Sequence, residues 1–370
     1  MKMTKIAVAA VALCTGAAFA QDAKVYATFD ASLATANNQG ATGASVTRMV
    51  SAGDAPSVFG VTGSKKLANG MTASGQYEAG INLSNGTVGA SANTVGATNS
   101  ANPALFNRLA NVGLAGNFGK VSLGLQLDPA FIAMLVTDPT GAKDISGGIS
   151  AWLAGGIATA GGLAATNTTG NQGNPAAAFT TNAVQYANQF GPVAVTASYG
   201  VGTTGNSDTT TAVGVIYGAG PLTVSGGVSN NSKSATTGLD SSSTVIGAAY
   251  QLGAWRLAAN YQTAKNNNLE LKTTGFGAIY GLSQATSLHA AMFQTQPSQS
   301  GVGNLNVMNL GVAHDLDKSV RLYAYLNTTQ ADANSLLVAG GWGSENAIGA
   351  FGAAAGKTVQ TMYLGTRVSF

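Results

Sequence analysis

The sequence predicts an all-β protein, a transmembrane, antiparallel, up-and-down barrel of about sixteen strands. Two observations lead to this fold class. Segments of about ten residues alternate apolar with polar side chains, and short and long connections follow one another in turn. A period of two places the apolar set on one face of a strand, which would meet lipid in a membrane barrel or the core in a soluble sandwich. Alternation alone does not separate these folds, whereas the connections do.

The alternation is clearest near residues 193–201, 222–229, 255–262 and 320–327. In the last of these segments Val320, Leu322 and Leu326 share one parity, and Arg321 and Asn327 share the other. The pattern is mixed near 58–66, 285–295 and 305–314, which we still expect to be strands.

The connections fall into two classes. Seven short turns rich in Gly, Pro, Asn or Asp are expected at Lys66–Gly70, Gly116–Gly119, Phe190–Pro192, Gly218–Pro221, Leu252–Gly253, Gly281–Gln284 and Asp315–Lys318. Eight longer polar loops are expected near 35–56, 84–104, 128–178, 202–208, 230–242, 265–269, 296–304 and 329–357. Short turns on one rim and long loops on the other are typical of an outer-membrane barrel, and closure removes every exposed edge.

The composition supports this reading. Charged residues make up 8% of the chain, against about a quarter in ordinary globular domains. Mean hydropathy is +0.17, and no uninterrupted apolar run of 18 residues follows the first twenty, which argues against membrane-spanning helices.

The first residues predict export. Lys2 and Lys5 precede the apolar stretch 6–13, and Ala18-Phe19-Ala20 supplies small residues at a cleavage site. We therefore expect a Sec-type signal peptide at 1–20, removed together with Cys14, and a single barrel domain at 21–370. Loss of the two lysines lowers the formal charge from +3 to +1, so no basic field suggests a nucleic-acid partner.

Four stretches carry a family resemblance. They are Lys24–Ala27 with Phe29-Asp30, Phe59–Met71, Val112–Gln126, and a last strand, Tyr363–Phe370, in which Leu364, Val368 and Phe370 share one parity. In these patches the chain resembles the trimeric Gram-negative porins, in particular the betaproteobacterial type.

The resemblance implies a water-filled channel in the outer membrane for passive diffusion of small hydrophilic solutes and ions. It implies a homotrimer surrounded by lipid and lipopolysaccharide, with no cofactor and no metal. Phe370 would be the assembly signal that the barrel-assembly machinery reads. The third loop would fold into the lumen and narrow it, with Asp128, Asp138, Lys143 and Asp144 as its charged constriction residues.

The basic side of the channel departs from the family. Val58, Thr62 and Leu125 stand where the family usually has Arg or Lys. The basic candidates left on the wet parity of the wall are Lys24, Lys120, Arg256, Arg321 and Arg367. With few wall charges, we predict a channel that sieves mainly by size and is weakly charge-selective.

Other functions have less support. An enzyme is not favoured, because His289 and His314 are the only histidines, and a polar turn explains the carboxylates beside His314. A β-solenoid adhesin or structural surface protein would show a fixed repeat, which is absent. A solute-specific porin stays open because of the long third loop; Trp152 in that loop is expected to pack rather than to bind a sugar. Several aromatic residues fit an interfacial girdle: Tyr77, Tyr186, Tyr199, Tyr217, Trp255 and Tyr261.

Overall fold

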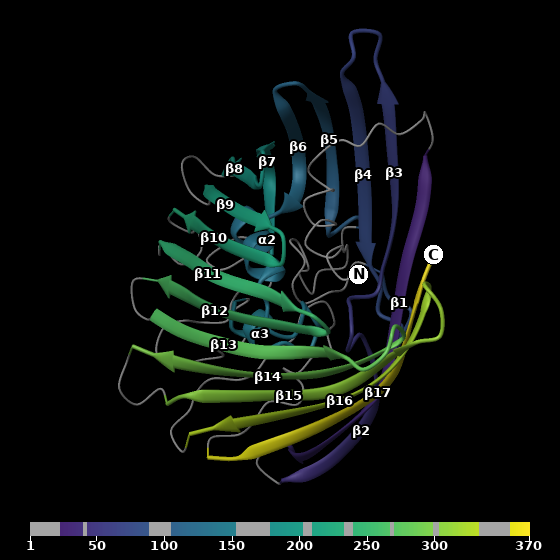
Figure 1. Ribbon diagram of the computed structural model, residues 1–370, viewed down its shortest axis with the longest axis vertical. Coiled ribbons are helices and arrows are strands. Elements are labelled where there is room, and N and C mark those ends of the chain that lie inside the picture. Colours follow the sequence, from purple (N-terminus) through teal and green to yellow (C-terminus); the bar gives the residue numbers. More distant parts are fainter. Residues whose placement is uncertain are drawn as a thin grey trace.

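The strands form one antiparallel sheet that closes into a barrel. The computed structural model describes residues 23–39, 43–88, 105–152, 178–202, 209–232, 240–266, 270–298, 303–332 and 356–370. The expected signal peptide and parts of all eight expected loops lie outside these residues. Closure occurs where β1 (Lys24–Gln39) pairs with β17 (Thr358–Ser369), for example Leu33 opposite Leu364 (Figure 1).

The other strands follow in chain order around the barrel. They are β2 (Ala44–Ser51), β3 (Val58–Lys66), β4 (Thr72–Gly80), β5 (Leu109–Gly116), β6 (Gly119–Leu127), β7 (Phe179–Phe190), β8 (Val193–Gly200), β9 (Thr210–Ala219), β10 (Leu222–Asn231), β11 (Ser241–Leu252), β12 (Trp255–Asn266), β13 (Glu270–Gly281), β14 (Thr286–Pro297), β15 (Leu305–Asp315) and β16 (Val320–Ala331). From β3 onward each strand pairs with the next. The three segments with mixed alternation are therefore strands, as predicted.

The second position in the barrel is divided between two strands. β2 pairs with the C-terminal half of β1, and β3 pairs with its N-terminal half. The barrel thus has sixteen positions, as expected, but seventeen strands. The expected first loop at 35–56 is wrong in extent, because most of it is β1 and β2. Residues 52–57 separate β2 from β3. Within them Ala52 has φ 122° and Pro56 has no N–H to donate to a β-ladder.

The seven expected short turns are confirmed. The described strands are joined there by residues 67–71, 117–118, 191–192, 220–221, 253–254, 282–285 and 316–319. Gly191 and Gly253 have φ of 59° and 57°, the left-handed conformation that tight two-residue hairpins require.

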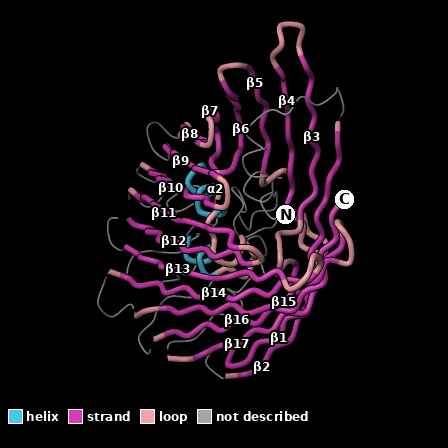
Figure 2. Tube along the Cα trace, in the orientation of Figure 1, coloured by secondary structure: helices cyan, strands magenta, loops and turns pink. Residues whose placement is uncertain are grey.

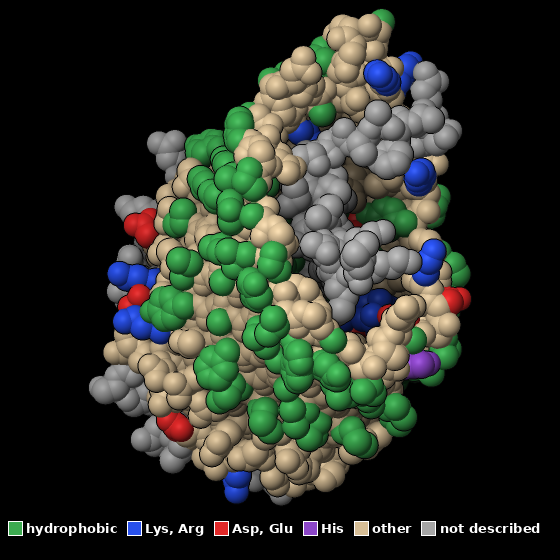
Figure 3. Space-filling view, viewed as in Figure 1, with side chains coloured by type: hydrophobic (Ala, Val, Ile, Leu, Met, Phe, Trp, Pro, Cys, Tyr) green, Lys and Arg blue, Asp and Glu red, His purple; other side chains and the backbone are tan. Residues whose placement is uncertain are grey.

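The two faces of the sheet differ as the alternation predicts. Figure 3 shows apolar side chains spread across the outer face of the barrel. Leu257, Leu322 and Leu364 are exposed there, whereas Tyr323 and Asn327, of the other parity, are buried on the inner face. The expected girdle residues Tyr77, Tyr199 and Trp255 are also exposed. An apolar outer face and a polar inner face suit a wall between lipid and water.

The described part of the third loop, residues 128–152, lies inside the barrel. It contains α2 (Pro129–Val136) and α3 (Gly147–Trp152), which Figure 2 shows within the ring of strands. α2 contacts β9, β10 and β11, and α3 contacts β12 to β15. Phe131 and Met134 of α2 are fully buried, so this apolar helix is covered by the wall and by the rest of the loop. Within the described residues, neither helix has the length and hydropathy needed to cross a membrane.

Candidate functional site: the inward loop and its charge cluster

Asp128 fixes the start of the inward loop to the wall. One of its carboxylate oxygens accepts from the backbone N–H groups of Ala130 (2.8 Å) and Phe131 (3.2 Å), which caps α2. The other oxygen accepts from the hydroxyls of Ser229 on β10 (2.9 Å) and Thr180 on β7 (3.3 Å). Burial raises the pKa of Asp128 to about 6, although these donors oppose the shift. Asp128 therefore lies beneath the helix, not on the aqueous surface expected of a constriction residue.

Asp138 and Arg256 fix the end of α2. Arg256 on β12 donates to the backbone carbonyls of Asp138 (3.0 Å) and Val136 (3.1 Å). The Asp138 carboxylate, which is fully buried, accepts from the hydroxyl of Ser146 at 2.7 Å and from the N–H of Thr140 at 2.9 Å. Burial raises the pKa of Asp138. Both residues hold the loop in place, a role that differs from the wall charge and constriction charge expected from the sequence.

Glycines on the inner wall form a seat for the loop. A Cβ on Gly227 of β10 would lie 2.6 Å from Cα of Ala130, closer than real Cβ atoms approach other atoms. Cβ atoms on Gly214 of β9 and Gly247 of β11 would collide with Pro129 and Thr137. Only glycine lets the helix lie this close to the strands.

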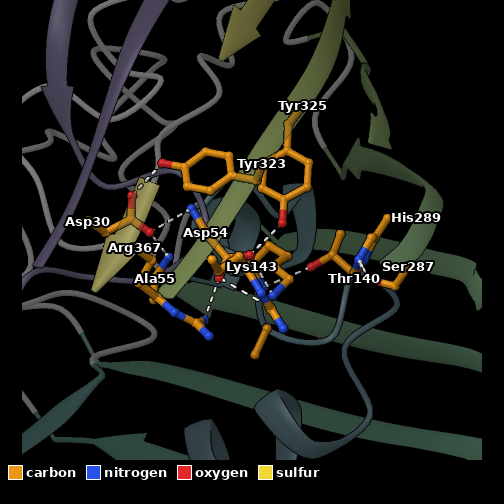
Figure 4. Close-up of polar contacts among 12 residues, drawn as sticks. Asp30, Asp54, Ala55, Thr140, Lys143, Ser287, His289, Tyr323, Tyr325 and Arg367 are labelled. Carbon is orange, nitrogen blue, oxygen red and sulfur yellow. Dashed lines mark hydrogen bonds and ion pairs between the residues drawn. The ribbon is translucent and has the colours of Figure 1, made fainter. Parts of the chain in front are cut away.

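Three cations converge on one carboxylate. Asp54, in the inward segment 52–57, has a completely buried side chain. Its Oδ1 lies 2.6 Å from Nζ of Lys143, and its Oδ2 lies 3.4 Å from a guanidinium nitrogen of Arg321 and contacts Arg367. The hydroxyl of Tyr325 also donates to it (Figure 4). Burial alone would raise the pKa of Asp54, but the three cations outweigh it and hold the pKa below its ordinary value.

Asp30 of β1 keeps Asp54 in this position. Its Oδ2 accepts from the backbone N–H groups of Asp54 (3.1 Å) and Ala55 (2.8 Å), and its Oδ1 accepts from the hydroxyl of Tyr323. Tyr323 and Tyr325 stack with ring centroids 4.8 Å apart, which places both hydroxyls over the inward segment. The segment crosses Tyr323 closely at Gly53, where a Cβ would lie 2.6 Å from the Tyr323 hydroxyl oxygen.

A second buried ion pair lies on a nearby stretch of wall, between β4 and the residue that precedes β5. Nε of Arg108 is 2.6 Å from Oε1 of Glu78, and the hydroxyl of Tyr26 donates to the other oxygen of Glu78 at 2.8 Å. The guanidinium also lies 5.2 Å from the ring centroid of Phe179. This pair compensates itself, so it adds no net charge to the lumen.

Some of these residues were predicted from the sequence as candidates, and others were missed. Lys143, Arg321 and Arg367 were candidates, and the structure brings them together. Asp54 was missed because it was assigned to an external loop, and Arg108 because it precedes a strand. The tyrosines share the inward parity of Arg321, a signal that could have found them.

Among the remaining candidates, Asp144 adjoins the cluster, because its N–H donates to the backbone carbonyl of Asp54 at 3.4 Å. Asp144 is buried in the loop, and burial raises its pKa well above the usual range. Lys24 is exposed at the start of β1, and Lys120 is half-buried beside the 117–118 turn. Phe370 packs edge-on against Phe29, with ring centroids 6.0 Å apart, and its N–H donates to the carbonyl of Ala27 at 2.9 Å. The side chain of Trp152 lies outside the described residues.

The described residues contain no group of three or more His, Cys, Asp or Glu side chains arranged to bind a metal. Nδ1 of His314 lies 2.8 Å from the hydroxyl of Thr286, and Nε2 of His289 lies 2.8 Å from that of Ser287. Each contact gives one ring nitrogen of each histidine a hydroxyl partner.

Comparison with known proteins gives consistent matches. A family model described as Gram-negative porin matches residues 7–334. Outer membrane porin protein 32 of Delftia acidovorans is 28% identical over 391 residues, which cover 100% of both chains. The structure of an anion-selective porin from Comamonas acidovorans superposes with a TM-score of 0.74 at 22% identity, covering 95% of this chain and 100% of that one. In-vitro folded OmpT of Vibrio cholerae, in its trimer form, gives 0.66 at 15% identity, with coverage of 95% and 100%.

Proposed function

The chain belongs to the Gram-negative porin family and is a passive channel of the outer membrane, and we propose that it selects only weakly between cations and anions. The observation that carries this proposal is that three cations, Lys143, Arg321 and Arg367, all contact the carboxylate of Asp54. Lys143, Arg321 and Arg367 form ion pairs with Asp54, and Arg321 also pairs with Asp315, so carboxylates compensate the cations within one connected set of contacts. A balanced cluster projects little field into the lumen, and size then decides which solutes pass.

The inward loop is the proposed constriction. Asp128, Asp138 and Arg256 would act by holding the loop against the wall, whereas Lys143, Arg321 and Arg367 would present charge to the permeation path. Asp144, Lys24 and Lys120 are proposed as lesser contributors, because Asp144 is buried, Lys24 lies at the start of β1 and Lys120 lies beside the 117–118 turn. Permeants would be small hydrophilic solutes and ions, and no bond would be made or broken.

The remaining expectations are proposals about assembly. The chain would be exported through cleavage after Ala20, and Phe370 would carry the signal for the barrel-assembly machinery. It would form a homotrimer in contact with lipid and lipopolysaccharide. The trimer form of the structurally similar Vibrio cholerae protein supports this oligomeric state.

Planar-bilayer recording of the refolded mature protein tests the proposal. We expect stepwise, ohmic conductance and a reversal potential close to zero under a potassium chloride gradient. A folded, heat-modifiable barrel without conductance would refute the open channel. A reversal potential close to that of a single ion would refute weak selectivity.

A further inference from the structure

Two arginines face each other across the last pair of strands. Arg321 of β16 and Arg367 of β17 are direct register partners, and both lie on the inner face. Like charges at such positions destabilise a sheet unless something compensates them. Their side chains keep 18% and 25% of their surface exposed, so their charge reaches the lumen.

Asp54 supplies the compensation from a distant part of the chain. Its Oδ2 contacts both guanidinium groups, while Oδ1 binds Lys143, which is carried by the inward loop. Asp315 pairs with Arg321 alone, through contacts of 2.6 and 3.0 Å. Among the described residues, Asp54 is therefore the carboxylate common to all three cations.

Without Asp54 this arrangement is one that binds anions. An ammonium and two guanidinium groups would converge on a single point, the geometry that proteins use for carboxylate and phosphate groups. In this protein the carboxylate of Asp54, a residue of the segment 52–57, occupies that point. The backbone contacts of Asp30 hold this carboxylate in place.

We infer that Asp54 is a selectivity-determining residue, a built-in counter-ion that keeps a basic, anion-attracting cluster neutral. The inference rests on the proposed channel function and deepens it. It assigns weak selectivity to one residue rather than to a general shortage of wall charges.

The test is the reversal potential of Asp54→Asn under a potassium chloride gradient. Asparagine keeps the shape and removes the charge, so we expect the permeability ratio to shift toward chloride by about twofold or more. Glu270→Gln is the matched control. It removes one negative charge at the start of β13, where Glu270 lies 3.6 Å from Lys272, outside the cluster, and it should leave the ratio near the wild-type value.

A folded, conducting Asp54→Asn channel with wild-type selectivity would overturn the inference while leaving the proposed channel function intact. If that variant does not fold, Arg367→Gln decides the question. It removes one cation and leaves Asp54 bound to Lys143 and Arg321, so the ratio should shift toward potassium. An unchanged ratio would overturn the inference. A wild-type protein that does not conduct would instead refute the proposed function itself.

Discussion

At the scale of single residues, the barrel interior contains carboxylates that are buried and fully engaged. Asp30, Asp54, Asp128 and Asp138 have little or no exposed surface, and each accepts several hydrogen bonds or ion pairs. Burying a carboxylate is costly unless donors surround it. These residues therefore stabilise positions of the chain, namely the inward segment and the two ends of α2.

The Asp128 carboxylate should make stability depend on pH. Its pKa is raised to about 6, above the value of an unfolded chain, so its contribution to stability is complete below about pH 4 and is lost as the pH rises through about 6. Asp128→Asn retains a good helix cap and cannot ionise. The quantity to compare is the unfolding free energy of the variant minus that of wild type. We expect this difference to be larger at pH 8 than at pH 4, by roughly 1–3 kcal/mol, in favour of the variant.

The measurement is the thermal midpoint of the detergent-solubilised barrel, wild type and variant, at both pH values. Other carboxylates act equally in the two proteins and cancel in the comparison. A difference that is the same at pH 4 and pH 8 would show that ionisation of Asp128 does not affect folding.

Tyr323→Phe should destabilise the inward segment. It removes the hydroxyl that donates to Asp30 and leaves a buried carboxylate oxygen without that partner, a loss of about 1–3 kcal/mol. Tyr363→Phe is the matched control, because Tyr363 is equally buried and its hydroxyl has no hydrogen-bond partner among the described residues. Unfolding midpoints in detergent should fall for the first variant only. Equal midpoints would mean that the contact with Asp30 contributes nothing.

At the scale of elements, the strands and the inward fold of the third loop were predicted, whereas the inward break at 52–57 was not. Lipid outside and water inside impose a period of two on every strand, so Leu322 and Arg321 reveal their faces within the sequence alone. The break at 52–57 depends on partners far along the chain, Asp30 and Tyr323, and leaves no periodic signal. For the same reason Asp128 was expected to face water, although Ser229 and Thr180 bury it.

The close approach of α2 to the wall gives a prediction for Gly227 of β10. Gly227→Ala places a Cβ against Ala130, and overpacking of this kind costs about 1–3 kcal/mol or displaces the helix. Displacement away from the wall moves α2 toward the lumen, so single-channel conductance should fall. Gly226→Ala, on the outer face of the same strand, is the control, because the new Cβ would lie 3.6 Å from the Val245 carbonyl oxygen, an ordinary van der Waals contact. Indistinguishable conductance and stability in the two variants would show that the glycine seat does not position the loop.

At the scale of the whole molecule, one seam closes the barrel. β1 is shared among β17, β2 and β3, and Phe370 adds its backbone bond to Ala27 at the end of the seam. Closure gives every described strand except β2 a partner on both sides, as a membrane wall requires of its backbone groups. The seam joins the two ends of the described chain, so it is the pairing with the greatest separation along the sequence.

The outer face of this seam tests the position of the barrel in the membrane. Leu364, in the middle of β17, and Val25, near the start of β1, are 64% and 76% exposed on the same apolar face. An arginine on the lipid face costs about 2–4 kcal/mol at the midplane and about 0–1 kcal/mol near the interface. Leu364→Arg should therefore lower the urea stability of the vesicle-inserted barrel much more than Val25→Arg. Equal losses would place both residues at one depth and contradict a barrel that crosses the bilayer along its strands, whereas a larger loss for Leu364→Arg would place Leu364 nearer the bilayer midplane than Val25.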